Sequence, residues 1–522
     1  MREIGRTFCL AALLAGPAFS ARAAVPDDLD RFVAESMKTF GAPGVSVAIV
    51  EDGKTVLAKG YGVRSIVTRA PVDSHTAFQI GSETKAFTAA AIALLVDEGK
   101  LTWDDRVVDR LPGFQMYDPY VTEHMTIRDL LSHRSGLGLG EGDLLLLPAS
   151  DRSRMDVVRA LRFLKPKTGF RETYAYDNIL YIAAGALIEA VSGQSWEDFV
   201  RTRILRPVGM DDSLVAYDPK APNAVGLHGR TGGVLRSDGA LHLLDHGIES
   251  PASGPAGMLN CSAEDMAKWM RVVLARGELD GGKRLYSETQ ARELWTPQVI
   301  VPSDPFAIDP SPVARKFQTY ALGWFVEDYH GHTIVEHAGG VFGGVALLAL
   351  IPEKGIGISV AINSEDSGVR RAIVSHLIDH YLGLPHEDWN LTYKALFDKM
   401  RADTQKALAA PRDEVKANDA HSLSIKSYAG AYQDVWYGPV TVKSGVDGKL
   451  SMKFDHTPGM EGPLLHVGDD VFKAVWGDPE MEPAYVKFLV KDGAVSQLKM
   501  WPASPVADFS FDYADLDFRP VH

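Results

Sequence analysis

The order of periodic segments along the chain limits the fold more than any single motif does. Residues 45–63 have the pattern of two strands joined at Asp52-Gly53, a dipeptide that suits the positive φ angles of a hairpin turn. Helical patterns follow, and β-rich segments return only much later, at residues 333–336, 345–351 and 356–363. We therefore expect an α+β domain in which both ends of this region build one antiparallel sheet, flanked by helices, with a helical region inserted between them.

A second domain is expected after this one. Residues 423–522 alternate apolar and polar side chains and carry turn signals at Asp447-Gly448 and Asp492-Gly493. Because single cores stop growing at roughly 250 to 300 residues, a chain of 522 residues should divide in this way. We predict a first domain over residues 24–385, a helical segment and linker over 386–422, and an all-β domain, barrel or sandwich, over 423–522.

The first residues have the pattern of an export signal. Arg2 and Arg6 precede an apolar stretch, and Ala21-Arg22-Ala23 fits a cleavage site. The apolar stretch is too short to cross a bilayer, and no later segment reaches that length. We predict a signal peptide over residues 1–23 and an exported protein, periplasmic or secreted. Only Cys261 then remains, so no disulfide within the chain is expected.

Charge and missing motifs exclude several function classes. The chain has 54 Lys and Arg against 68 Asp and Glu, a formal net charge of −14, which gives no electrostatic reason to bind nucleic acid or anionic lipid. The sequences G-x-S-x-G, H-E-x-x-H and G-x-x-x-x-G-K-[ST] are absent. We expect no metal and no cofactor, and a small molecule or a short peptide as the substrate.

Two Ser-x-x-Lys tetrads occur, and their contexts differ. Ser496 lies in an alternating strand pattern, where residues three apart point to opposite faces, so Lys499 cannot reach its hydroxyl. Ser82 begins a helical, apolar run in which Lys85 is a neighbour on the same face. The helix N-terminus favours negative charge near the serine, and the apolar run can desolvate Lys85 so that its neutral form accepts a proton. From this tetrad alone, a capping serine beside an exposed lysine remains an equal alternative.

Two later motifs join the Ser82 tetrad: Tyr176-x-Asn178 before a helical pattern, and His337-x-Gly339 between apparent strands. In order and approximate separation, the three resemble the motifs of the serine β-lactamase and penicillin-binding-protein-like superfamily, especially its class C-like hydrolase branch. The phrases TIRDLLSHRSGL and YALGW also resemble that branch. The resemblance covers roughly residues 28–385, and the all-β tail is similar to a lipocalin-like module often appended to this branch.

The resemblance implies a serine hydrolase that works through an acyl-enzyme. Ser82 would be the nucleophile, Lys85 its proton acceptor, and Tyr176 a phenol that relays a proton to or from the leaving group. Asn178 would hold either the substrate or Lys85.

The third motif supplies the remaining implied roles. Gly340, which follows Gly339, would contribute its backbone N–H to an oxyanion hole beside the N–H of Ser82. His337 would face the substrate, in a place where relatives that recognise penicillin usually carry lysine. Because imidazole is mostly neutral at pH 7, this departure favours D-amino-acid peptidase, amidase or esterase activity. A β-lactamase or D-alanyl-D-alanine carboxypeptidase and a non-catalytic penicillin-binding-like sensor remain the alternatives.

Three further features carry smaller expectations. We expect Asp177 to be exposed and His133 to make a hydrogen bond that fixes its loop. Four adjacent leucines at residues 144–147 are expected to be shielded from water. We expect them to line the substrate pocket, to pack against the all-β domain, or to pack against a second copy of the chain, which would make the protein a homo-oligomer.

Overall fold

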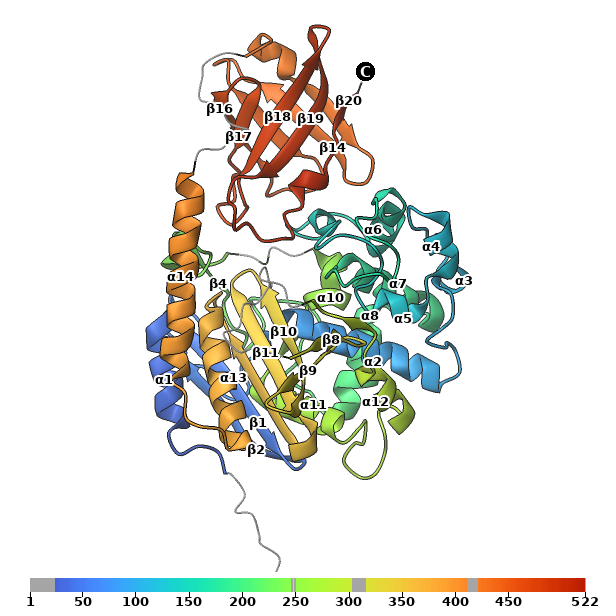
Figure 1. The fold of residues 1–522 in the computed structure, drawn as a ribbon, viewed down its shortest axis with the longest axis vertical. Helices are drawn as coiled ribbons and strands as arrows, with labels where there is room; N and C mark the ends of the chain where they lie inside the picture. Colours follow the sequence, from blue (N-terminus) through green and yellow to red (C-terminus); the bar gives the residue numbers. More distant parts are fainter. Residues whose placement is uncertain (1–23, 246, 248–249, 303–315, 411–420, 522) are drawn as a thin grey trace, which may run out of the picture.

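A computed structural model of the chain describes residues 24–245, 247, 250–302, 316–410 and 421–521. The predicted signal peptide, residues 1–23, lies outside the described residues. Figure 1 shows two parts, a mixed helix and sheet domain below and an all-β domain above. No helix among the described residues combines the length and the apolar character needed to cross a bilayer.

One eight-stranded sheet forms the centre of the first domain. Both ends of the domain contribute to it, because β1 pairs antiparallel with β12, with Val45 opposite Ile362. Its antiparallel pairs confirm the sheet predicted from the two groups of strands. In spatial order the strands are β2 (Lys54–Gly62), β1 (Gly44–Glu51), β12 (Ile356–Ile362), β11 (Gly344–Ile351), β10 (His332–Val341), β9 (Phe325–Tyr329), β8 (Gln318–Tyr320) and β7 (Val299–Ile300).

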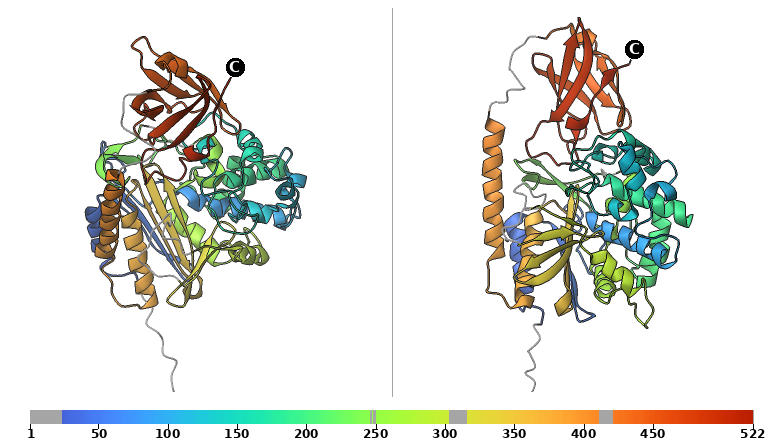
Figure 2. Two further views of the ribbon diagram at one scale, coloured as in Figure 1. Left: turned by 45° about the horizontal axis from the view of Figure 1, so that its top comes forward. Right: turned by 45° about the vertical axis from the view of Figure 1, so that its right-hand side comes forward.

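Helices cover both faces of this sheet, as Figure 2 shows. One face carries α1 (Leu29–Phe40) and α13 (Ser367–Leu382), with α14 (Trp389–Ala409) outside them. The other face carries α11 (Ala263–Leu274) and the inserted helical region. Because α2 (Thr84–Asp97) and α7 (Ile179–Ser192) are apolar on every side, they form the buried centre of that region.

The remaining elements of the first domain are short. They are helices α3 (Val107–Arg110), α4 (Pro119–His124), α5 (Ile127–Leu130), α6 (Arg154–Ala160), α8 (Trp196–Val200), α9 (Arg206–Val208), α10 (Gly254–Gly257) and α12 (Glu288–Trp295), and strands β3 (Phe78–Gln79), β4 (His228–Gly232), β5 (Gly239–Leu243) and β6 (Asn260–Cys261).

The second domain is a nearly closed antiparallel barrel, which confirms the all-β prediction. Its last strand pairs with β13, and a bridge between Leu498 and Phe518 brings β19 close to it. Ser496 lies in β19, as predicted, and donates its hydroxyl proton to Leu489 O. The strands are β13 (Gly430–Asp434), β14 (Gly438–Ser444), β15 (Leu450–Phe454), β16 (Glu461–Gly468), β17 (Val471–Ala474), β18 (Ala484–Lys491), β19 (Ala494–Pro502) and β20 (Arg519–Pro520).

The barrel rests on the first domain, over the ends of β10 and β11 and beside α6 (Figures 1 and 2). Polar contacts join the two domains, including Lys167 to Asp515 at 2.5 Å and His242 to Glu480 at 2.8 Å. The barrel therefore covers the end of the sheet that carries the His-x-Gly motif.

Candidate active site

Ser82 and Lys85 lie side by side at the start of α2. A single 3-10 turn, Gly81–Glu83, carries the serine directly into the helix. Lys85 Nζ is 2.9 Å from Ser82 Oγ, and the lysine side chain is 0% exposed. The alternative of a capping serine beside an exposed lysine is therefore wrong.

Lys85 Nζ has three hydrogen-bond partners, and the Ser82 hydroxyl is one of them. Its Nζ donates to Asn178 Oδ1 at 2.7 Å and to Ala256 O at 3.0 Å, and both of these oxygens can only accept. Burial lowers the pKa of Lys85 to about 7, although Asp143 and Asp177 act in the opposite direction. A neutral amine has two hydrogens and one lone pair. In this neutral form, with both hydrogens directed to Asn178 and Ala256, the lone pair faces the hydroxyl of Ser82, as a base requires.

Tyr176 lies over this dyad as a neutral phenol. Burial raises the pKa of Tyr176 far above its ordinary value, although a hydrogen bond with Ser82 lowers it. Lys85 Nζ lies 4.8 Å from the centroid of the tyrosine ring. The phenol is therefore placed to pass a proton near Ser82, while Lys85 is the more readily available base.

Asn178 directly precedes α7 and joins Lys85 to a carboxyl group that the sequence did not predict as part of the site. Its Nδ2 donates to Asp143 Oδ2 at 2.8 Å, while its Oδ1 faces Lys85. Asp143 is 1% exposed, and burial raises its pKa to about 7. The only sequence signal was an acidic residue placed directly before four leucines.

Both ring nitrogens of His337 form hydrogen bonds with other protein atoms. Nδ1 lies 2.7 Å from Ala338 O and must donate to it, so Nε2 accepts from the Tyr320 hydroxyl at 3.0 Å. The side chain is 2% exposed, and burial beside Lys85 lowers the pKa of His337 to about 3. The ring is neutral, and the expectation that it faces the substrate finds no support in this geometry.

Two glycines bring β10 against the turn that holds Ser82. A Cβ added at Gly339 would lie 1.8 Å from Ile80 O, and one added at Gly81 would lie 2.6 Å from Gly340 N. Gly81 also has a φ of +53°, which favours glycine. A Cβ at Gly340 would meet nothing within 4 Å, so open space lies next to this residue. The backbone of Gly340 is thus held against Gly81, the residue before Ser82, beside an open volume.

The barrel reaches this site through one segment, residues 508–513. Phe509 packs edge-on against Tyr176, with ring centroids 6.1 Å apart. Ser510 Oγ donates to Asp143 Oδ2 at 2.8 Å. Asp512 accepts from Leu144 N at 3.1 Å, so the all-β domain contacts the backbone of the leucine stretch.

Two residues beside Tyr176 test the smaller expectations. Asp177 is 0% exposed, so the expectation of an exposed side chain is wrong. It is buried with Ser135, whose hydroxyl donates to it at 3.3 Å, and burial raises its pKa to about 7. His133 Nδ1 accepts from Asp177 N at 3.2 Å, which confirms the loop-fixing hydrogen bond.

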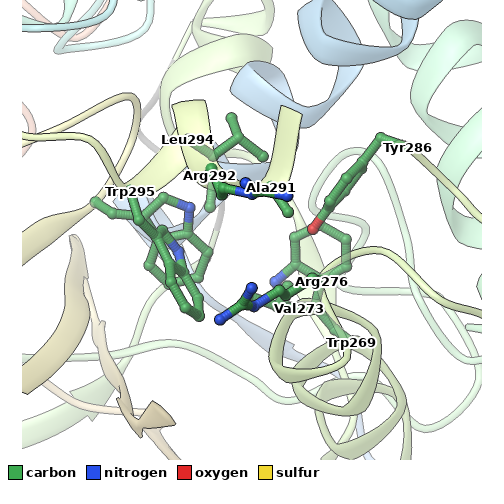
Figure 3. Close-up of a pocket in the computed structure, with 10 residues that line it drawn as sticks. Trp269, Val273, Arg276, Tyr286, Ala291, Arg292, Leu294 and Trp295 are labelled. Atoms are coloured by element: carbon green, nitrogen blue, oxygen red, sulfur yellow. The ribbon is translucent and has the colours of Figure 1, made fainter. Parts of the chain in front are cut away.

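Two cavities lie near these elements. A pocket of about 210 Å³ borders Ala86 and is lined by Trp269, Trp295 and Trp324, as Figure 3 shows in part, and its lining does not include Ser82. A larger cleft of about 600 Å³ lies between the domains, with Pro148 and Leu244 on one side and residues 477–481 of the barrel on the other. Across the described ranges, no three His, Cys, Asp or Glu side chains are grouped so as to hold a metal ion.

Known families match almost the whole chain. A family model described as Beta-lactamase matches residues 29–410, and one described as a domain of unknown function (DUF3471) matches residues 414–520. The sequence is 32% identical to an unguisins hydrolase, ungD', of Aspergillus campestris (strain IBT 28561), over 80% of this chain and 78% of that protein. It is 28% identical to penicillin-binding protein 4 of Amycolatopsis lactamdurans, over 65% of this chain and 85% of that protein.

Solved structures agree with these matches. An octameric penicillin-binding protein homologue from Pyrococcus abyssi aligns with a TM-score of 0.58 and 25% identity, over 91% of this chain and 97% of that chain. A class C beta-lactamase aligns with a TM-score of 0.54 and 19% identity, over 67% of this chain and 96% of that chain. The second likeness shows the fold of the first domain.

Proposed function

This chain belongs to the Beta-lactamase family of serine hydrolases, and from that premise we propose that it cleaves an amide, peptide or ester bond through an acyl-enzyme on Ser82. One observation carries the proposal. Both hydrogens of a neutral Lys85 are used by Asn178 and Ala256, so its lone pair faces the Ser82 hydroxyl at 2.9 Å.

The contacts support a definite sequence of steps. As Ser82 Oγ attacks the substrate carbonyl carbon, its proton moves to Lys85 Nζ. The negative charge that develops on the carbonyl oxygen is met by the backbone N–H groups of Ser82 and Gly340. The leaving group departs with a proton passed through Tyr176, and the acyl group stays on Ser82. Water then attacks the ester carbon in the reverse order of proton transfers, which frees the acid and restores the serine.

We propose D-amino-acid peptidase, amidase or esterase activity ahead of β-lactamase or D-alanyl-D-alanine carboxypeptidase activity. His337 supports this choice, because a neutral buried ring offers no fixed positive charge to a substrate carboxylate. The relative from Aspergillus campestris is named as a hydrolase of unguisins, not of penicillins.

Two further proposals concern the setting of the activity. The export pattern of residues 1–23 supports a periplasmic or secreted protein. The octameric homologue from Pyrococcus abyssi supports assembly into a homo-oligomer.

Covalent labelling tests the proposed function. The full chain is incubated with a fluorophosphonate probe, and its intact mass and labelled peptide are measured. We expect one label on Ser82, no label on the Ser82→Ala variant, and full labelling of the matched Ser496→Ala variant. Loss of the label from the Ser496→Ala variant alone would show that the nucleophile is Ser496 and that our choice of tetrad is wrong.

Turnover on a panel separates the alternatives. D- and L-aminoacyl amides, short esters and β-lactams are compared by kcat/KM. We expect turnover of amides or esters above that of β-lactams. Acylation without release of free enzyme on every substrate would identify a sensor instead of a hydrolase.

A further inference from the structure

The carboxyl group of Asp143 lies behind Asn178, on the side away from Lys85. Its Oδ2 accepts two hydrogen bonds of 2.8 Å, one from Asn178 Nδ2 and one from Ser510 Oγ of the barrel. Asp143 and Ser510 are both buried, and 367 residues separate them along the chain. A group from each domain thus meets on one oxygen, two hydrogen bonds away from the amine of Lys85.

This contact decides which way the amide of Asn178 points. An amide presents an acceptor oxygen at one end and a donor NH₂ group at the other. Because Asp143 provides an acceptor, the NH₂ group faces it and the oxygen faces Lys85. In the flipped amide the NH₂ group would face Lys85 and compete for the lone pair that the Ser82 proton needs.

The barrel also fixes the backbone on both sides of Asp143. Asp512 Oδ2 accepts from Gly142 N at 2.6 Å, and its Oδ1 accepts from Leu144 N at 3.1 Å. Gly142 has a φ of +89°, and a Cβ there would lie 2.7 Å from Ile179 Cδ1. Asp512 therefore holds the backbone N–H groups of the two residues that flank Asp143.

We propose that Asp143 is a positioning residue that orients Asn178 and, through it, Lys85, and that the barrel completes this arrangement through Ser510 and Asp512. This inference rests on the proposed function of Ser82 as nucleophile. It assigns the second domain a direct part in acylation, because without Ser510 the carboxyl oxygen behind Asn178 loses one of its two partners.

The test is the rate of Ser82 labelling by the fluorophosphonate probe in full-length variants. Asp143→Leu removes the acceptor, and we expect labelling at least about tenfold slower, the effect of losing one hydrogen bond to a carboxylate. Asp143→Asn keeps an acceptor of the same shape, and we expect it to restore most of the rate. The rescue separates loss of the acceptor from loss of the negative charge, because asparagine keeps the first and not the second.

Ser510→Ala provides a second test if the Asp143→Leu variant does not fold, because it removes only the hydroxyl that donates to Asp143. We expect its labelling to be slower by up to about tenfold. Ser496→Ala is the matched control, since it also removes a hydroxyl hydrogen bond from the barrel but lies in β19, away from residues 508–513. We expect the control to label at the rate of the unmodified chain.

A double variant shows whether Asp143 acts through Asn178. If it does, Asp143→Leu added to Asn178→Ala slows labelling no further, because the amide that Asp143 orients is already gone. Equal labelling rates in Ser510→Ala, Ser496→Ala and the unmodified chain, with the label on Ser82, would overturn the inference and leave the proposed function intact. Labelling of the unmodified chain anywhere other than Ser82 would overturn both.

Discussion

The Tyr320 hydroxyl donates a hydrogen bond of 3.0 Å to Nε2 of His337. Tyr320 also lies 3.4 Å from the hydroxyl of Tyr181, which donates to Leu131 O. The hydroxyl that holds His337 therefore lies beside that of Tyr181 in the helical region, and both groups are buried. The neutral ring can accept the Tyr320 proton at Nε2, whereas a protonated ring has no lone pair there to accept it.

We predict that His337→Lys does not create a preference for substrates with a carboxylate beside the scissile bond. A lysine there would be buried next to Lys85, and two cations in one buried site repel each other. The measurement is the ratio of kcat/KM for matched carboxylate and methyl-ester substrates. A ratio that rises tenfold in a folded variant would show that this position faces the substrate after all.

Activity should depend on pH through Lys85. The base must be neutral, and its pKa is about 7, so kcat/KM falls as the pH drops below that value. Asp177 raises the pKa of Lys85 because its negative charge favours the ammonium form. We predict that Asp177→Asn moves this acidic limb to lower pH, measured as a kcat/KM profile between pH 5 and 9.

The control for this shift is Asp434→Asn in the barrel. Asp434 is also buried, but its contacts are the N–H groups of Trp436, Tyr437 and Asp517. We expect its profile to match that of the unmodified chain. A limb that moves to higher pH in Asp177→Asn would contradict the sign of the electrostatic effect.

We predict that Gly339→Ala lowers kcat by about 100-fold, as loss of an oxyanion donor does. The added Cβ would lie 1.8 Å from Ile80 O, so β10 has to move away from the turn that carries Ser82. Gly430→Ala is the steric control, because its Cβ would meet only Tyr432, at 3.9 Å. Steady-state kinetics with one ester substrate measures both variants. Full activity in Gly339→Ala would mean that the close approach of the two backbones is not needed.

Phe509 should limit the size of the group bound beside Tyr176. Its ring packs edge-on against that of Tyr176 and also lies against Gly140. We predict that Phe509→Ala raises kcat/KM for a bulky ester relative to a small one, because it removes the barrel side chain that occupies the space beside Tyr176. An unchanged ratio would place the substrate on the other side of Tyr176.

Local patterns predicted the parts of the site that are close in sequence. The spacing of Ser82 and Lys85 fixes their contact because both lie at the start of one helix, where residues three apart are neighbours. The hairpin after Val45 and the late strands predicted the sheet for the same reason, since each pattern is local. The prediction of an exposed Asp177 is wrong because it rests on the usual exposure of aspartate. The burial of this side chain depends on Ser135 and on the tertiary packing around it.

Contacts between the two domains could not be predicted from local patterns in the sequence. Asp143 and Ser510 meet only because the barrel docks over the end of β10, and neither residue stands in a recognisable motif. The alternation of the tail predicted its strands but not the surface that they present. The irregular segment of residues 508–513, which carries the contacts, follows β19 and has no periodicity of its own.

The hydrogen bond from Ser510 to Asp143 has a consequence for the order of events during synthesis. Contacts so distant along a chain form after local ones, because the intervening segment has to be ordered first. During synthesis Ser82 and Lys85 leave the ribosome well before Ser510, whose hydroxyl contacts the carboxyl group behind Asn178. On the role that we propose for Asp143, hydrolytic competence is a property of the completed molecule, because a half-made chain lacks the contacts that orient Asn178.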